Sequence, residues 1–186
     1  MDSTTVSAPA GATFEEVVLP NLDAAYRLAR WLTGNQHDAE DIVQEASLRA
    51  LRYFQTFSGG NGRAWFLRIV RNTCYGWRNH EPPAPVELFD EEQHSGVNAT
   101  KDPEALLIDA ANVELINDAI RSLPERSREL LVLREIEGLS YQELADVLEI
   151  PIGTVMSGLS RARQALRRAV VVQLELVDQE PALALA

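Results

Sequence analysis

The chain has 186 residues, of which 46% are hydrophobic, and a formal net charge of −11. This length and composition suffice for one ordinary domain or two small ones, and they exclude a chain that is disordered throughout. The single cysteine, Cys74, has no disulfide partner and no metal-ligand companion at short spacing, so we expect a reducing compartment and no metal site. Neither a signal peptide nor an apolar run of about 18 residues is visible, which predicts a cytoplasmic protein without membrane insertion.

Charge is distributed unevenly along the chain. Residues 1–80 carry eight Arg against eight acidic residues, residues 81–120 one Lys against ten, and residues 121–186 eight Arg against ten, so the segment charges are 0, −9 and −2. Two stretches contain no acidic residue: 46–80, with six Arg, and 150–174, with four. Salt screens charges beyond about 8 to 10 Å, so a distant acidic segment does not exclude nucleic-acid binding by these basic stretches.

The first expected helix runs from about Phe14 or Leu19 to Thr33 and the second is DAEDIVQEASLRALRYFQTF, with Gly34 as the stop of the first and Asp38 as the start of the second. The second helix has an apolar stripe at helical spacing that we expect to face the core: Ala39, Ile42, Val43, Ala46, Ala50, Tyr53 and Phe54. Its other side carries Asp41, Gln44, Glu45, Leu48 and Leu51. That side is either the margin of a wide core face or a docking face for a partner, and the pattern alone favours the former.

A third helix, RAWFLRIVRNTCYGWRN, follows the loop FSGGNG. We expect its core face to hold Phe66, Ile69, Val70, Thr73 and Trp77, and its other face to hold Arg68, Arg71, Asn72, Tyr75 and Arg78, with Trp65 at the edge. Arginines interleaved with an aromatic, with no acidic residue nearby in the sequence, are typical of a surface that follows a phosphate backbone and stacks unpaired bases. A merely solvated face is the alternative, although ordinary surfaces mix charges of both signs.

Residues 81–111 are expected to be an acidic flexible linker, because four prolines stand there among acidic and small polar residues without a sustained helical period. After it, Ser122 and Glu125 are spaced as a capping box for a helix that stops at Gly138. Ser140 and Glu143 form a second capping box before the short helix YQELADVL.

The turn EIPIG leads into a last helix that starts near Gly153 and has its own two faces. Its apolar line is Val155, Leu159, Ala162, Leu166 and Ala169, and its outward face is Met156, Ser157, Ser160, Arg161, Gln164, Arg167 and Arg168. A short helix, a tight turn and a helix with a basic outer face predict a DNA-binding helix-turn-helix, although helical hairpins that bind no DNA share this period.

The blocks DAEDIVQEASLRAL, RAWFLRIVRNTCY and LPERSRELLVLREIEGLSYQELADVLEIPIGTVMSGLSRAR resemble bacterial RNA polymerase sigma factors of the extracytoplasmic-function (ECF) type. The resemblance covers about residues 19–168, with the blocks in the family's order and spacing. It implies an all-α protein of two small helical domains, a region 2 bundle of three to four helices at 14–80 and a region 4 helix-turn-helix at 112–172. The linker is 81–111 and a C-terminal tail is 173–186.

The same resemblance implies an alternative sigma factor that binds core RNA polymerase and directs promoter-specific transcription initiation under the control of an anti-sigma factor. Such a protein has no enzyme activity of its own, needs no cofactor and binds promoter DNA. Two alternatives are a sigma-like mimic that sequesters an anti-sigma factor and a helix-turn-helix regulator that does not bind polymerase.

Site residues follow from the resemblance by position. Contacts to the clamp helices of the largest polymerase subunit are expected from Asp38, Asp41, Gln44, Glu45 and Leu48, and region 4 is expected at the polymerase flap. The expected minus-ten set is Asn61, Arg63, Trp65, Arg68, Arg71, Asn72 and Tyr75. The expected minus-thirty-five set is Thr154, Met156, Ser157, Ser160, Arg161 and Gln164.

One departure concerns the start of the last helix. Relatives commonly have Arg where this chain has Gly158, and Lys where it has Met156. Fewer charges there are expected to weaken phosphate anchoring.

Overall fold

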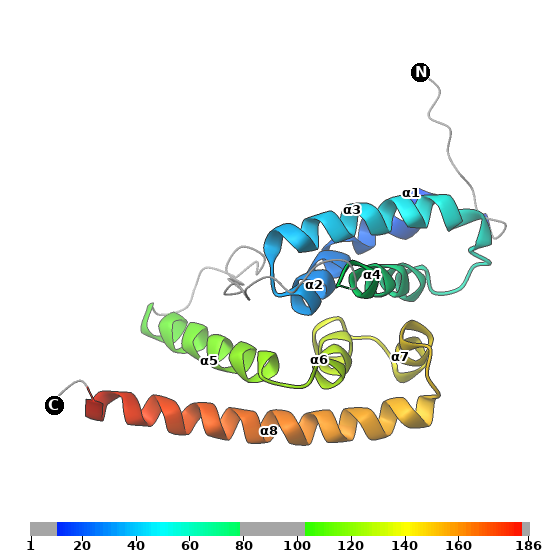
Figure 1. Ribbon diagram of the computed structural model, residues 1–186. Coiled ribbons are helices and arrows are strands. Elements are labelled where there is room, and N and C mark those ends of the chain that lie inside the picture. Colours follow the sequence, from blue (N-terminus) through cyan, green and yellow to red (C-terminus); the bar gives the residue numbers. More distant parts are fainter. Residues whose placement is uncertain (1–10, 79–102, 184–186) are drawn as a thin grey trace. The chain divides into compact units, whose positions relative to one another are not determined.

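The computed structural model describes residues 11–78 and 103–183, with side chains over 11–77 and 112–175 (Figure 1). The elements in these ranges are helical, which confirms the all-α prediction. They fall into two compact units: residues 11–78 with 132–156, and residues 103–131 with 157–183. Residues 81–102 of the expected linker lie outside the described residues.

The first unit begins with a run of helices: α1 (Phe14–Val18), the 3-10 turn η1 (Leu19–Asn21), α2 (Leu22–Thr33), α3 (Gln36–Tyr53), the 3-10 turn η2 (Phe54–Thr56) and α4 (Gly62–Arg78). Gly34 ends α2 in the left-handed conformation, with φ 74°, as predicted. Asn35, rather than Asp38, starts α3, because the Asn35 side chain accepts a hydrogen bond from the Asp38 backbone N–H at 3.0 Å.

The core of α2, α3 and α4 is built largely from the predicted stripes. On α3, Ala39, Ile42, Ala46, Ala50 and Phe54 are buried and Val43 is half-buried, but the prediction for Tyr53 is wrong, since it is 60% exposed. The helix ends at Tyr53 and the chain turns into η2, which carries Phe54 into the core and leaves Tyr53 outside. On α4, Phe66, Val70 and Thr73 are buried, Ile69 and Trp77 are half-buried, and Leu67 and Cys74 join the core.

An aromatic cluster fixes the end of α3 to the start of α4. The Phe54 ring lies edge-on to Phe14 and Trp65, with centroid distances of 5.6 and 6.0 Å. Phe57 stacks on Phe54 at 5.9 Å and contacts Trp65 at 5.2 Å. Such ring pairs add about 0.5 to 1.5 kcal/mol each beyond the area that they bury, so the loop between the two helices is anchored at both ends.

The rest of the first unit comes from much later in the chain: the π-helix η4 (Val132–Ile136), α7 (Tyr141–Leu148) and the first turn of α8 (Ile152–Leu183). In the π turn the Glu137 N–H donates to the Val132 carbonyl, five residues back, at 2.9 Å. Gly138 then reverses the chain with φ 68°. The capping box of Ser140 and Glu143 is confirmed, and α7 ends at Glu149, whose φ is 55°.

The second unit contains α5 (Pro103–Arg121), α6 (Glu125–Leu131) and the remainder of α8. Residues 103–111 are therefore helical, where the sequence favoured a flexible linker. The Ser122 hydroxyl donates to the Ala119 carbonyl at the end of α5, at 2.7 Å. The core joins Leu123, Leu131 and Ala162, with Ala165, Leu166 and Ala169 packed around them.

Both predicted faces of α8 are confirmed. Val155, Leu159 and Ala162 are buried, while Leu166 and Ala169 are half-buried. The predicted outward residues are all exposed: Met156, Ser157, Ser160, Arg161, Gln164, Arg167 and Arg168. The helix continues to Leu183, so residues 173–183 of the tail extend it.

Gly158 lies where α8 crosses α6. A Cβ atom at this position would stand 2.8 Å from Cδ1 of Leu130, a side chain in the second unit that is only 3% exposed. The missing side chain therefore permits close helix packing, and position 158 points toward α6 rather than along the exposed face of α8.

We expect Gly158→Ala to destabilise the protein. The better helix former gains about 0.5 to 1 kcal/mol, but crowding a packed core costs about 1 to 3 kcal/mol, so a net loss of up to about 2.5 kcal/mol is expected in urea unfolding followed by circular dichroism. Ser160→Ala, on the exposed face of the same helix, is the matched control and should be neutral or slightly stabilising. Adding Leu130→Ala should make Gly158→Ala much less harmful; a simple sum of the two losses would contradict the packing explanation.

Candidate nucleic-acid interface

The loop before α4 is shaped by its own hydrogen bonds. Gly59 and Gly60 adopt φ of 91° and 90°, values that side chains other than glycine rarely accept. The Asn61 side-chain oxygen accepts from the Ala64 N–H at 3.0 Å and so caps α4. The Asn61 side-chain amide donates to the carboxylate of Glu143. Asn61, predicted as a minus-ten residue, thus also holds the start of the helix.

A small cavity of about 280 Å³ lies beside this loop in the first unit. Its lining combines an aromatic wall with polar groups: Thr56, Phe57, Ser58, Gly59, Asn61, Ala64, Trp65, Arg68 and Asp146. Three predicted minus-ten residues, Asn61, Trp65 and Arg68, therefore share one cavity. A concave site with an aromatic wall and a few polar groups suits a flat, polar ligand such as a nucleobase.

The remaining predicted minus-ten residues continue along α4. The Arg71 guanidinium lies over the Tyr75 ring, 4.8 Å from its centroid, and Arg71 also donates to the Asn72 side-chain oxygen at 3.3 Å. Asn72 is exposed, whereas Arg71 and Tyr75 are half-buried. The side chain of Arg78 lies outside the described residues.

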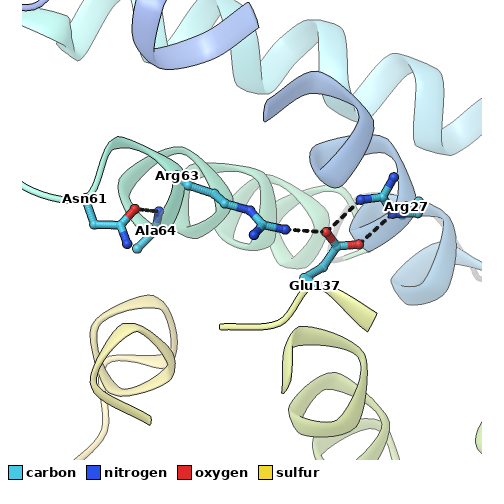
Figure 2. A network of polar contacts seen from close by, with 5 residues as sticks. All are labelled: Arg27, Asn61, Arg63, Ala64 and Glu137. Carbon is cyan, nitrogen blue, oxygen red and sulfur yellow. Dashed lines mark hydrogen bonds and ion pairs between the residues drawn. The ribbon is translucent and has the colours of Figure 1, made fainter. Parts of the chain in front are cut away.

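The arginines at the start of α4 have acidic neighbours in the fold, although none is nearby in the sequence. Arg63 contacts the Glu137 carboxylate at 2.7 Å, and the Arg68 guanidinium lies 3.9 Å from that of Glu149 (Figure 2 shows the first pair). All four residues belong to the first unit. The acidic residues are more than 70 positions away in the sequence, so counting local charges could not find them.

Glu137 is the most heavily compensated of these carboxylates. Arg27 of α2 binds it with two nitrogens, Nε to Oε1 at 2.8 Å and Nη2 to Oε2 at 2.9 Å, and Arg63 adds a third contact (Figure 2). The Glu137 side chain is fully buried, while Arg27 and Arg63 keep 34% and 36% of theirs exposed. Removing a partner from a buried ion pair typically costs about 3 to 5 kcal/mol, and less where water reaches the partner, as it does here.

The sequence singled out neither Arg27 nor Glu137. Arg27 lies outside the quoted motif blocks, Glu137 lies inside the third block without an assigned role, and 110 positions separate the two residues. The available signal was an acidic residue just before Gly138, at the end of a strongly apolar run. That position predicts a helix end, not a buried charge.

The predicted polymerase-docking set lies on one side of α3. Leu48 and Leu51 are 52% and 42% exposed, although both are large and apolar. Gln44 is exposed, Asp38, Asp41 and Glu45 are half-buried, and Glu45 pairs with Arg49 at 2.7 Å. The wide-core alternative therefore does not account for Leu48 and Leu51.

The predicted minus-thirty-five set lies at the start of α8. Thr154, Met156, Ser157, Ser160, Arg161 and Gln164 are all exposed on that helix. Its first turn follows α7 through Glu149 and Pro151, which gives the helix–turn–helix order expected from the sequence. The side chains are thus available on one helix face.

The described part of the chain contains no cluster of three or more His, Cys, Asp or Glu residues that could hold a metal ion. None of its helices combines the length and apolarity needed to cross a membrane.

The chain is similar to proteins of a known family in both of its helical regions. Sigma-70 region 2 matches residues 17–80, and sigma-70 region 4 matches residues 114–166. The chain is 35% identical over 141 residues to the ECF RNA polymerase sigma-E factor of Escherichia coli, which covers 72% of this chain and 74% of that protein. The chain belongs to the ECF sigma factors.

A second relative of this ECF sigma factor is SigE of Mycolicibacterium smegmatis, an ECF RNA polymerase sigma factor that is 36% identical over 155 residues. That match covers 83% of this chain but only 60% of the relative. Two solved structures share the fold at 24% identity: the sigma factor RpoE with the anti-sigma factor NepR from Bartonella quintana, and CnrH with the cytosolic domain of CnrY. The TM-scores are 0.66 for RpoE and 0.62 for CnrH. Both matches cover 86% of this chain, and they cover 97% of the RpoE chain and 88% of the CnrH chain.

The family match divides this ECF sigma factor differently from its compact units. Within the region 4 match, residues 132–156 belong to the first unit, together with the described part of the region 2 match. The acidic partners of Arg63 and Arg68 are thus region 4 residues.

Glu143 of this ECF sigma factor shows how the capping box and the α4 contacts combine. Hydrogen bonds from Ser140 lower the pKa of Glu143 from its ordinary value; burial opposes them, and Asn61 and Arg63 each lower the pKa by less than burial raises it. A depressed carboxyl pKa contributes stability that is present above the unfolded-state pKa and is lost as pH falls through the folded-state pKa.

We therefore expect Glu143→Gln to reduce the acid sensitivity of the protein. At neutral pH the variant should be less stable than the wild type, and the difference should shrink as pH falls from the ordinary carboxyl pKa of 4.5 through the lower folded-state pKa of Glu143. Urea unfolding over a pH series measures this. Ser140→Ala removes the first cause of the shift and should flatten the profile in the same way; parallel profiles for wild type and both variants would contradict the assignment.

Proposed function

We propose that this ECF sigma factor binds core RNA polymerase, directs it to specific promoters in the cytoplasm and is held in check by an anti-sigma factor. It has no enzymatic activity and no cofactor; it acts by binding. The observation that carries the proposal is the occurrence of region 2 and region 4 on one chain in the family's order, each with an exposed polar surface of the kind that its partner needs. The structure of the sigma factor RpoE bound to the anti-sigma factor NepR, which shares this fold, supports control by an anti-sigma factor.

Each surface has a distinct task in this proposal. The α3 face with Asp38, Asp41, Gln44, Glu45 and Leu48 docks on the clamp helices, where its exposed leucine supplies apolar contact and its carboxylates select basic partners. The α4 surface captures the unpaired minus-ten strand, with a base in the cavity beside Trp65 and further bases stacked near Tyr75. The start of α8 reads the minus-thirty-five duplex.

Run-off transcription with purified core polymerase on pooled linear genomic fragments tests the whole proposal. Adding the chain should yield discrete transcripts from a subset of fragments. Tyr75→Ala should lose most of this activity on duplex templates and regain it on premelted ones, because stacking is worth roughly 1 to 3 kcal/mol per base and serves strand opening. Binding to an anti-sigma factor without any initiation would favour the sigma-like mimic instead.

The docking assignment has its own test. Asp41→Arg with Glu45→Arg reverses the charge of the α3 face, and we expect core-polymerase affinity to fall at least about tenfold, roughly 1.4 kcal/mol. Glu15→Arg with Asp23→Arg changes the net charge equally at exposed positions of α1 and α2 and should bind as the wild type does. Equal loss in both double variants, measured by fluorescence anisotropy with labelled protein, would show a general charge effect and remove the assignment.

A further inference from the structure

Three carboxylates of residues 132–156 occupy donors that nucleic acid would need. Glu137 accepts from Arg63 at 2.7 Å, Glu143 accepts from the Asn61 side chain, and Glu149 lies 3.9 Å from Arg68. Asp146, from the same segment, lines the cavity that also contains Trp65. All of these residues belong to the first compact unit.

These contacts are unequal in strength. Glu149 and Asn61 are exposed, so their contacts exchange readily with water. Glu137 is different, because its side chain is fully buried and its carboxylate is held by three guanidinium hydrogen bonds. A carboxylate removed from water in this way requires its cationic partners, whereas the two arginines, a third exposed, can turn to other anions.

Carboxylates and phosphates compete for the same guanidinium donors, since both present paired oxygens in the geometry that arginine matches. An arginine bound to Glu137 has fewer donors left for a phosphate. A cavity bounded by Asp146 likewise places a negative side chain where a nucleotide would bring negative phosphate.

We propose that residues 132–156 form an autoinhibitory segment whose carboxylates occupy the single-strand surface of α4, with Glu137 as its buried anchor. This inference rests on the proposed function, because it takes Asn61, Arg63 and Arg68 as DNA contacts. In the closed form the segment and single-stranded DNA exclude each other. Opening releases Asn61, Arg63 and Arg68 together.

The segment hides one DNA surface and leaves the other available. Thr154 and Met156 at its end, and Ser160, Arg161 and Gln164 farther along α8, are exposed in the same structure. Closure therefore blocks capture of the unpaired strand while the duplex-reading face remains accessible. A sigma factor in this state is prevented from opening DNA but not from touching it.

Glu137→Gln is the most direct test, because it keeps the size of the side chain and removes the charge that holds two arginines together. The probe is a fluorescein-labelled, mixed-sequence single-stranded DNA of about 16 nucleotides, and anisotropy with the full chain gives the affinity. We expect binding roughly 3- to 10-fold tighter than for the wild type, as when a minor binding-competent form becomes the major one. Binding to an upstream-element duplex should not change.

Glu135→Gln is the matched control, since it makes the same charge change at an exposed position two residues away. It should bind single-stranded DNA as the wild type does. Glu149→Gln, which removes an exposed carboxylate near Arg68 and leaves the core intact, should shift affinity in the same direction as Glu137→Gln but by less. If circular dichroism shows that Glu137→Gln does not fold, the affinity of Glu149→Gln tests the autoinhibitory segment instead.

Hydrogen exchange supplies a readout without DNA: exchange over residues 61–68 and 139–149 should be faster in Glu137→Gln, with helical content unchanged. Equal affinities in wild type and both test variants, an equal gain in Glu135→Gln, or no binding by any variant overturns the autoinhibitory segment. Run-off transcription by the wild type separates the two proposals. Specific initiation together with unchanged affinities leaves the sigma function standing and removes only the segment.

Discussion

The Glu137 carboxylate is fully shielded from water, and residues from three distant stretches of the first compact unit meet at it. Its two cationic partners come from α2 and α4, while the carboxylate itself follows a π turn that occurs much later in the chain. Guanidinium groups bind carboxylates in a planar, directional way, so the contact specifies orientation as well as proximity. Apolar packing among α2, α3 and α4 has no such directionality.

The α4 surface is prepared by the fold before any ligand arrives. Asn61 caps α4, two glycines with positive φ shape the loop before it, and the rings of Phe54 and Phe57 contact Trp65. A surface with fixed side chains loses less entropy on binding than a loose one. Because the α4 surface is rigid, carboxylates of the same chain can also fit it. A surface that binds phosphate groups well can therefore bind the protein's own acidic side chains.

Much of the fold was predictable because its signals are local. The capping box of Ser140 and Glu143, the stop at Gly34 and the stripes of α3 and α8 depend on residues a few positions apart, and the structure confirms them. The prediction that Tyr53 faces the core was wrong because α3 ends at this residue, so the spacing of an α-helix no longer determines which side chains face inward. The linker prediction did not hold for residues 103–111, because acidic residues and a proline are typical of a linker but are also found at the start of a helix, as in α5.

The candidate site was predictable only in part, since its polar partners are distant in sequence. The residues on α4 could be chosen from composition and family resemblance, but Glu137, Glu143 and Glu149 meet them through tertiary packing. Gly158 illustrates the opposite case. It was expected to matter for phosphate contact, and the structure gives it a steric reason through Leu130.

The π turn at Val132–Ile136 determines the direction in which the Glu137 carboxylate points, so that direction depends on the number of residues in this stretch. Its hydrogen bond from Glu137 spans five residues instead of four, which is the signature of one residue inserted into an ordinary α-helix. Each residue of an α-helix advances the side-chain direction by about 100°. Loss of one residue here would restore regular helix geometry and turn the carboxylate away from both arginines. Over evolution, this stretch should therefore accept substitutions at its exposed positions far more readily than any change in its length.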